Sequence, residues 1–155
     1  MQVPEYLPHI DLLLSALRIN RERLDSAAKV AVDARLLRGL IVAMVARAPF
    51  SEEFYLETYP DIAEAHAAGR IADPRRHFVE VGFFEGRLGV SPGVDEQFYL
   101  SLYRDVAQAV ARGDVASAAD HYIRQGIAEG RVPNAEVKPE ADSWASLLGS
   151  NARMG

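Results

Sequence analysis

Residues 54–87 read FYLETYPDIAEAHAAGRIADPRRHFVEVGFFEGR, and residues 98–131 read FYLSLYRDVAQAVARGDVASAADHYIRQGIAEGR. The two stretches align without a gap at a constant offset of 44 residues, since 98 − 54 and 131 − 87 give the same value. Both keep an aromatic start, an Asp-Ile/Val-Ala step, a His-Phe/Tyr pair and a closing Glu-Gly-Arg. Self-similarity at a fixed period is typical of repeat architectures. The sequence therefore predicts two tandem copies of one structural unit.

Local start and stop signals predict several short helices in each copy. Ser51 and Asp95 stand where an N-cap is needed, and each precedes an acidic residue that suits the positive end of a helix. Pro60 must end or restart a helix, and Gly69 and Gly113 suit a left-handed stop. Further start signals are the Asp73-Pro74 pair and Ser117. We expect an all-α fold.

The N-terminal region predicts one short helix opened by Pro8 and a longer one that runs from Asn20 or Asp25 to Arg47, or a single continuous helix. Apolar residues recur in the longer helix at steps of three and four, as in a helix seam: Ala27, Val30, Ala34, Leu37, Ile41, Met44 and Ala48.

Three interpretations of this seam stay open. The helix is the central core of one globule, or its seam pairs with a second chain in a symmetric dimer, or the first helix folds back over it as a hairpin and leaves a monomer. Partner-binding candidates on this helix are Leu37, Ile41 and Met44. We expect a homodimer.

The resulting domain organisation has four parts: an N-terminal helical region (1–49), a first repeat (50–93), a second repeat (94–134) and a flexible tail (135–155). The tail begins as a polar linker without periodicity and ends in a stretch too short to form a stable helix alone. Its apolar residues either fold back on the body or dock on a partner: Trp144, Leu147 and Leu148.

Composition narrows the function classes. A hydrophobic share of 49% and a charged share of 25% suit an ordered, soluble globular protein. The net charge of −5 argues against duplex nucleic acid as a partner, because phosphate binding needs clustered cations. No cysteine is present, which excludes disulfides and thiolate metal sites. Neither a signal peptide nor a bilayer-length apolar run is visible, so we expect a cytoplasmic protein without a direct membrane span.

Each copy carries a His, a Glu and an Arg that resemble an acid, a base and an anion clamp. A catalytic set repeated in tandem would mean two identical sites in one small protein, whereas residues that hold a repeat together recur by necessity. We expect structural roles, with the arginines bonded to helix-end carbonyls or to carboxylates and the histidines as half-buried donors. These repeat-structural residues are Asp61, His77, Glu85, Arg87, Asp105, His121, Glu129 and Arg131.

No catalytic, metal or cofactor site is expected. His77 and Glu80 lie one turn apart, yet Arg124 replaces the glutamate in the second copy. The alternatives to an interaction protein are a small hydrolase or transferase that uses the His/Glu/Arg set, and a glycan-binding module that stacks sugars on exposed tyrosines. An enzyme would bring those side chains together at an open pocket, and a glycan-binding module would expose several repeat aromatics.

The repeated motif resembles a small helical repeat of roughly 40 residues found with bacterial glycosyltransferases and surface-polysaccharide proteins. The resemblance covers residues 50–134 and rests on Phe-Tyr-Leu, Tyr-x-Asp-Ile/Val-Ala, the capping glycines, His-Phe/Tyr and Glu-Gly-Arg; Arg104 stands where the first copy has Pro60. It implies a non-catalytic interaction or scaffold module, accessory to bacterial surface or exopolysaccharide biosynthesis. The implied partner is a protein such as a glycosyltransferase or polysaccharide synthase.

Overall fold

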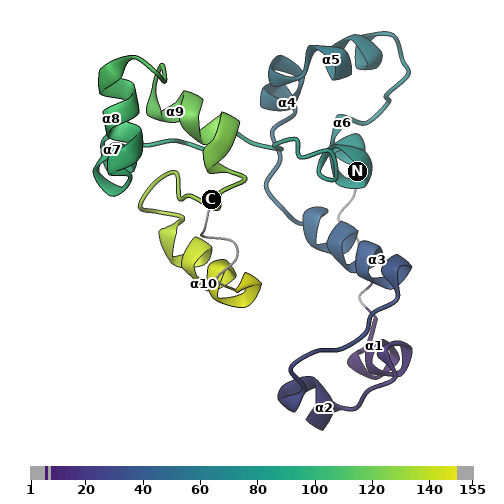
Figure 1. Ribbon diagram of the computed structural model, residues 1–155. Coiled ribbons are helices and arrows are strands. Elements are labelled where there is room, and N and C mark those ends of the chain that lie inside the picture. Colours follow the sequence, from purple (N-terminus) through teal and green to yellow (C-terminus); the bar gives the residue numbers. More distant parts are fainter. Residues whose placement is uncertain (1–5, 7, 150–155) are drawn as a thin grey trace. The chain divides into compact units, whose positions relative to one another are not determined.

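Helices alone make up the regular structure of the described chain, which confirms the predicted all-α class (Figure 1). The computed structural model describes residue 6 and residues 8–149. No helix within those ranges is both long enough and apolar enough to cross a membrane. The chain divides into two compact units between Ser91 and Pro92.

Unit 1 holds the N-terminal helices and the first copy of the repeated sequence. Its elements are α1 (Ile10–Leu17), α2 (Arg21–Ser26), α3 (Ala34–Val45), α4 (Glu52–Thr58), α5 (Pro60–Ala67), α6 (Pro74–His77) and η1 (Phe78–Gly82). The side chain of Ser51 caps α4 and that of Asp73 caps α6, as their positions in the sequence predict. Pro60 is the first residue of α5, where its missing N–H costs nothing.

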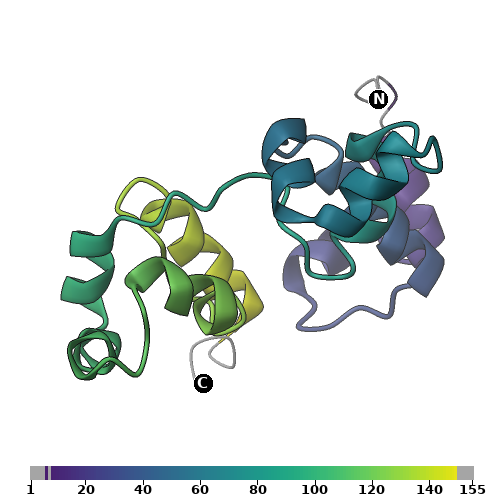
Figure 2. The same ribbon diagram turned by 90° about the horizontal axis from the view of Figure 1, so that it is seen from above.

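Unit 2 holds the second copy and the C-terminal helix. Its elements are α7 (Glu96–Leu102), α8 (Arg104–Arg112), α9 (Ala118–His121), η2 (Tyr122–Gly126) and α10 (Lys138–Leu148). Asp95 caps α7, Ser117 caps α9, and Gly113 ends α8 in the left-handed conformation. In both views α10 lies next to the chain that ends the second copy (Figures 1 and 2).

The single long helix expected near residues 20–47 is wrong. Helix α2 ends at Ser26 and Ala27 is extended, so the chain is not helical again until Ala34. Helix α3 starts there because the carboxylate of Asp33 accepts hydrogen bonds from the backbone N–H groups of Arg35 and Leu36. Ala27 and Val30 therefore lie outside the helix, and the predicted seam is not continuous.

The polar linker expected at the start of the tail is also wrong. Residues 138–148 form α10, whose second residue is Pro139, a position where a helix tolerates proline. Asn134 holds the preceding turn, since its amide donates to the carbonyl of Gly93 and its oxygen accepts from the N–H of Val137. A side-chain contact 41 residues away in sequence thus orders a segment that lacks helical periodicity.

A fully buried tyrosine lies at the centre of each copy. Tyr55 packs with Phe78 and Val79 beside α3, and Tyr99 packs with Val106 and Ala118. Each tyrosine also contacts the ring four residues later, at the C-cap of its helix, as the sequence spacing predicts. In each copy, the other helices therefore pack around the helix that carries this tyrosine, α4 in the first copy and α7 in the second.

A single π-helical turn ends the last helix of each copy. The N–H of Phe83 bonds to the carbonyl of Phe78, and that of Ile127 to Tyr122, five residues apart in both cases. Gly82 and Gly126 lie where the buried tyrosine hydroxyl touches this turn, and any Cβ there would overlap that hydroxyl. Glycine is therefore needed at this position so that the helix can approach the tyrosine closely.

Candidate functional site

The clearest polar cluster in each copy is built on the Glu-Gly-Arg turn. Gly86 adopts φ of 78°, and the N–H of Arg87 then bonds to the carbonyl of Gly82. This closure directs the arginine back toward the start of α5. Gly130 and Arg131 repeat the same arrangement in unit 2.

Each of these arginines forms a two-pronged bond with an aspartate. Arg87 meets Asp61 through N–O distances of 3.0 and 2.8 Å and also bonds Glu85 at 2.8 Å. Arg131 meets Asp105 at 3.1 and 2.7 Å, and its Nε bonds the carboxylate of Glu129. Of the two partners expected for the arginines, the carboxylates are therefore the ones observed. Bidentate pairs of this kind are both strong and directional.

The electrostatics of the cluster follow from this pairing. The hydrogen bond from Arg87 lowers the pKa of the Asp61 carboxyl, and Arg131 does the same for the pKa of Asp105. The guanidinium of Arg87 also lies over the ring of Tyr59, 4.9 Å from its centroid, and Arg131 lies 4.8 Å from that of Tyr103. Each arginine thus pairs with two carboxylates of its own copy.

The histidines belong to a different contact. His77 Nδ1 lies 3.0 Å from the hydroxyl of Tyr55, and His121 Nδ1 lies 3.0 Å from that of Tyr99. His121 is buried, so the expectation of two half-buried histidines holds only for His77. Burial raises the pKa of both Tyr55 and Tyr99 to about 12. The histidine therefore bonds the central tyrosine, while the arginine of the same motif bonds Asp61 or Asp105 and the glutamate accepts a hydrogen bond from that arginine.

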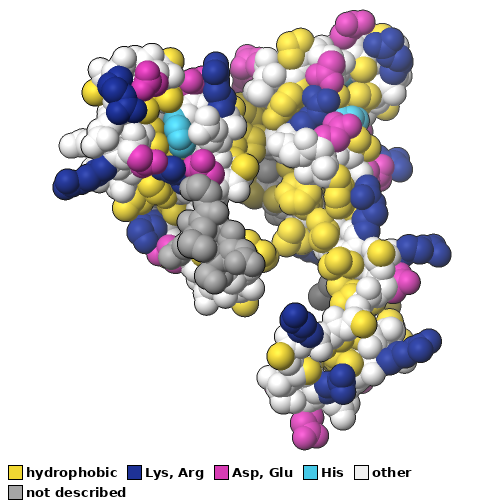
Figure 3. Space-filling view, in the orientation of Figure 1, with side chains coloured by type: hydrophobic (Ala, Val, Ile, Leu, Met, Phe, Trp, Pro, Cys, Tyr) yellow, Lys and Arg dark blue, Asp and Glu magenta, His cyan; other side chains and the backbone are white. Residues whose placement is uncertain are grey.

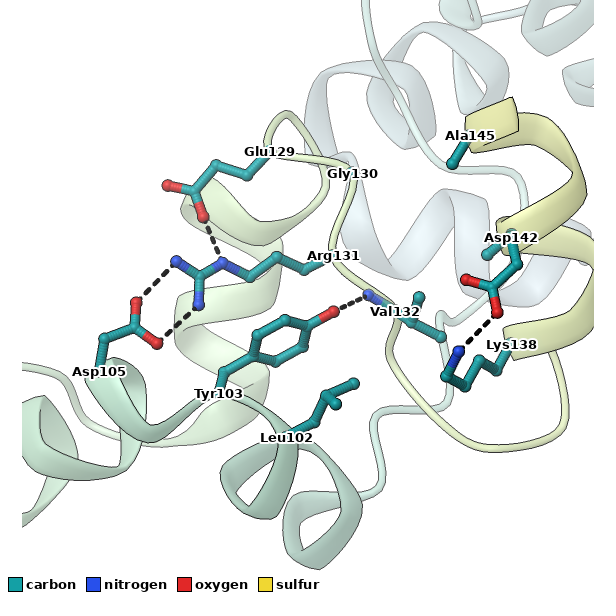
Figure 4. Close-up of a pocket in the computed structure, with 11 residues that line it drawn as sticks. Leu102, Tyr103, Asp105, Glu129, Gly130, Arg131, Val132, Lys138, Asp142 and Ala145 are labelled. Carbon is teal, nitrogen blue, oxygen red and sulfur yellow. Dashed lines mark hydrogen bonds and ion pairs between the residues drawn. The ribbon is translucent and has the colours of Figure 1, made fainter. Parts of the chain in front are cut away.

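A cavity of about 410 Å³ lies beside the Arg131 cluster in unit 2. Its walls bring Arg131, Asp105 and Glu129 opposite Lys138 and Asp142 of α10 (Figure 4). The charged groups on each wall pair within that wall, as Lys138 does with Asp142. The cavity could admit a small polar molecule, but its lining includes only part of the proposed acid–base set and not His121.

The two tyrosines near the start of each copy are covered by the fold of that copy. Tyr55 and Tyr99 have no exposed surface, and the hydroxyls of Tyr59 and Tyr103 accept hydrogen bonds from the backbone of Leu88 and Val132. Arginine covers one face of each of the latter two rings. These four tyrosines thus serve the fold of each copy rather than presenting open rings.

The partner-binding candidates on α3 separate into two groups. Ile41 packs against the core of the first copy, whereas Leu37 and Met44 are exposed. Leu40, which the seam pattern did not include, is exposed beside them. Figure 3 shows the hydrophobic side chains gathered over this helix.

Helix α3 is fastened to the first copy by polar contacts that the sequence analysis missed. Arg75 donates to the carbonyls of Ala46 and Ala48 just beyond the helix end. Arg38 donates to the carbonyl of Glu80, and its guanidinium lies 3.8 Å from the ring centroid of Phe84. The sequence indicates these contacts indirectly, because the residues that make them are absent from the second copy: Ala119 stands in place of Arg75, and Ala128 in place of Phe84.

The candidates in the C-terminal segment lie on one helix and remain uncovered. Trp144, Leu147 and Leu148 of α10 are 52%, 79% and 66% exposed. The sequence left two possibilities for these side chains, packing on the body of the same chain or docking on a partner. In the structure they do not pack on the body.

No group of three or more His, Asp or Glu side chains in the described ranges is arranged to hold a metal ion. Comparisons with protein-family models, with curated proteins and with solved structures find no match.

Proposed function

We propose that this chain is a non-catalytic interaction module that assists bacterial surface or exopolysaccharide biosynthesis in the cytoplasm. The observation that carries the proposal is the outer side of α3, where Leu37, Leu40 and Met44 are 48%, 40% and 47% exposed. Their spacing of three and four residues puts them in one ridge along the helix. Contiguous apolar surface of this kind is typical of a protein-binding site.

The opposite side of α3 supports the same conclusion. Val45 is buried in the core of the first copy, Arg75 bonds the C-terminal end of the helix, and Arg38 bonds the first copy from the second turn of the helix. A partner would therefore meet a helix that is already ordered, so binding loses little conformational entropy. The ridge suits a helix or an apolar groove on another protein.

The polar residues of the repeat fit this role as supports of the scaffold. Arg87 and Arg131 donate hydrogen bonds to carboxylates of their own copy, and His77 and His121 bond the central tyrosines. The link to polysaccharide production, and a glycosyltransferase or polysaccharide synthase as the partner, rest on the resemblance of residues 50–134 to the repeat described above.

Site-specific photo-crosslinking in the source bacterium tests the proposal. A photoreactive residue in place of Leu37 or Met44 should form an adduct with a glycosyltransferase or polysaccharide synthase, identified by mass spectrometry. The matched control is the same residue at Gln108, an exposed position on α8.

A second variant checks that the ridge itself binds. Leu40→Asp adds a charge to the ridge and should remove the adduct formed from position 37, with the helical circular dichroism unchanged. Equal adducts from positions 37 and 108, or adducts only with proteins unrelated to glycan synthesis, would contradict the proposal.

A further inference from the structure

The two copies differ in what covers their last helical turn. In the first copy, Val79 of η1 lies in the same cluster as Val45 of α3 and is only 2% exposed. The corresponding residue of the second copy, Ile123 of η2, is 57% exposed. The backbone turn is the same, so the difference arises because α3 packs on the first copy within unit 1, whereas α10 of unit 2 makes no comparable contact with η2. The second copy therefore leaves open the surface around Ile123 that corresponds to the surface covered by α3 in the first copy. We call this open surface the empty seat, and the surface under α3 the occupied seat.

The side chains around the empty seat are also smaller than those around the occupied one. Three large side chains that surround α3 in the first copy are replaced by smaller ones at the positions 44 residues later: Phe50 by Val94, Arg75 by Ala119, and Phe84 by Ala128. Because packed interiors are filled to a nearly constant density, a helix on the second copy needs bulkier side chains than the valines that α3 contributes.

The order of the charged pair at the edge of the seat is reversed. In the first copy, Arg38 of α3 donates to the backbone carbonyl of residue 80, a glutamate whose side chain pairs with Arg76. In the second copy this pair is inverted, because Asp120 and Arg124 occupy the two positions. An arginine at position 124 repels a helix with the charge of α3 and favours one that brings a carboxylate to the same place.

Helix α10 carries the side chains that this seat requires. Its Glu140, Trp144 and Leu147 have the i, i+4, i+7 spacing by which Arg38, Val42 and Val45 of α3 meet the first copy. At these three positions α10 offers a carboxylate in place of the arginine and larger apolar groups in place of the valines. Trp144 and Leu147 are both exposed in the single chain.

We propose that Trp144 and Leu147 of α10 dock on the Ile123 face of a second copy of this chain, with Glu140 beside Arg124 of that copy. The occupant is a second copy because the other side of α10, at Ala141 and Ala145, already faces the cavity of its own unit. Each chain carries both the helix and the seat. Two chains therefore exchange α10 helices across a two-fold axis and satisfy both seats at once.

This dimer replaces the one expected from the α3 seam. Ile41, a residue of that seam, packs against the core of the first copy and does not face a partner chain. The α10 dimer uses neither Leu37 nor Met44. It is thus separate from the partner surface proposed on α3, and either proposal can fail without the other.

The chain's single tryptophan makes the test direct. Light scattering on the full chain should give the mass of two chains at high concentration and of one chain after dilution. The fluorescence of Trp144 should shift to longer wavelength over the same concentration range, because dissociation exposes the indole to water. A wild type that stays monomeric at all concentrations, or a dimer whose Trp144 emission does not change on dissociation, overturns the proposal.

Substitutions locate the interface. Ile123→Asp should abolish the dimer and leave the helical circular dichroism unchanged, since the side chain is already exposed in the single chain. Leu37→Asp is the matched control on α3 and should leave the dimer intact. A dimer that Leu37→Asp disrupts and Ile123→Asp does not would place the interface on α3 and overturn the proposal.

Charge reversal tests the register of the docked helix. Glu140→Arg and Arg124→Glu should each raise the dimer Kd by up to about thirtyfold, because the two-fold axis makes the pair occur twice and one exposed ion pair is worth up to about fivefold. Arg124→Glu also breaks the pair with Asp120 in the same chain, so the double variant is the decisive one. Recovery of the wild-type Kd in the double variant supports the contact, and additive losses refute it.

Discussion

At the scale of single residues, the repeated motif is explained by a few close contacts around one buried tyrosine per copy. Its hydroxyl bonds the histidine Nδ1 and touches the glycine of the π-helical turn. The positions that recur 44 residues apart are therefore those at which a different side chain would collide or would leave a buried polar atom without its partner.

Gly82→Ala should destabilise the protein by about 1–3 kcal/mol, because the added methyl overlaps the Tyr55 hydroxyl in a packed core. Gly39→Ala in α3 is the control, since a Cβ there meets nothing within 4 Å and should stabilise the helix by about 0.5–1 kcal/mol. Urea denaturation measures both. Tyr55→Phe combined with Gly82→Ala should recover part of the loss, and strict additivity of the two changes would count against this explanation.

The buried tyrosines also predict how stability responds to alkali. Their pKa is raised from 10.0 to about 12, so the unfolded chain loses these protons at a lower pH than the folded chain. The free energy of unfolding should be unaffected by them below pH 10 and should fall as the pH rises from 10 toward 12.

Denaturation curves recorded across that range, together with the phenolate absorbance of the folded protein, check this prediction. Tyr99→Phe removes one of the two ionisations and should flatten the fall. If the absorbance of all six tyrosines rose together near pH 10, the buried hydroxyls would have to be accessible, contrary to the structure.

At the scale of elements, α3 is an addition to the first copy rather than part of the repeat. Its own sequence places the apolar residues, but long-range bonds from Arg75 decide which side is buried. Helix α10 is likewise an addition, to the second copy, but it does not cover Ile123; Asn134 orders the turn before it, and Lys138 lines the cavity beside the Arg131 cluster.

Arg75→Ala should weaken the attachment of α3 by about 1.5–3 kcal/mol, because two carbonyls lose a charged donor. Hydrogen exchange of residues 34–46 should become faster, with little change in α4 and α5. The neighbouring Arg76→Ala is the control, since it removes only an exposed pair with Glu80. Equal acceleration of exchange by both variants would show that Arg75 has no special role.

At the scale of the whole chain, two small cores stabilise two separate units. The residues of the first cluster lie within positions 41–79 and those of the second within positions 94–122. Neither cluster includes a residue of the other unit.

A destabilising change should therefore act on one unit only. Tyr99→Phe removes the bond to buried His121 and should cost about 1–3 kcal/mol in unit 2. Hydrogen exchange should accelerate between residues 94 and 131 and stay unchanged between residues 50 and 87. Tyr55→Phe should give the opposite pattern, whereas acceleration in both units by either variant would mean that the chain unfolds as one body.

Short-range information in the sequence was enough for the helices of the two copies. N-caps such as Ser51 and Asp95, the N1 proline of α5 and the left-handed Gly113 act within one turn of their own position, so their effect can be read residue by residue. Asp33 carries the same kind of N-cap signal, but the apolar periodicity that runs across it indicates one longer helix instead.

Packing between distant segments was decided only by the tertiary structure. Periodicity marks Leu37 and Ile41 alike as apolar positions of a helix, yet one faces water and the other the core, because Arg75 and Arg38 orient α3 on the first copy. Val79 and Ile123 are equivalent in sequence and opposite in burial for the same reason. Burial depends on which segment lies opposite in space, and local sequence carries little of that information, since the free energy comes from contacts between residues far apart in the chain.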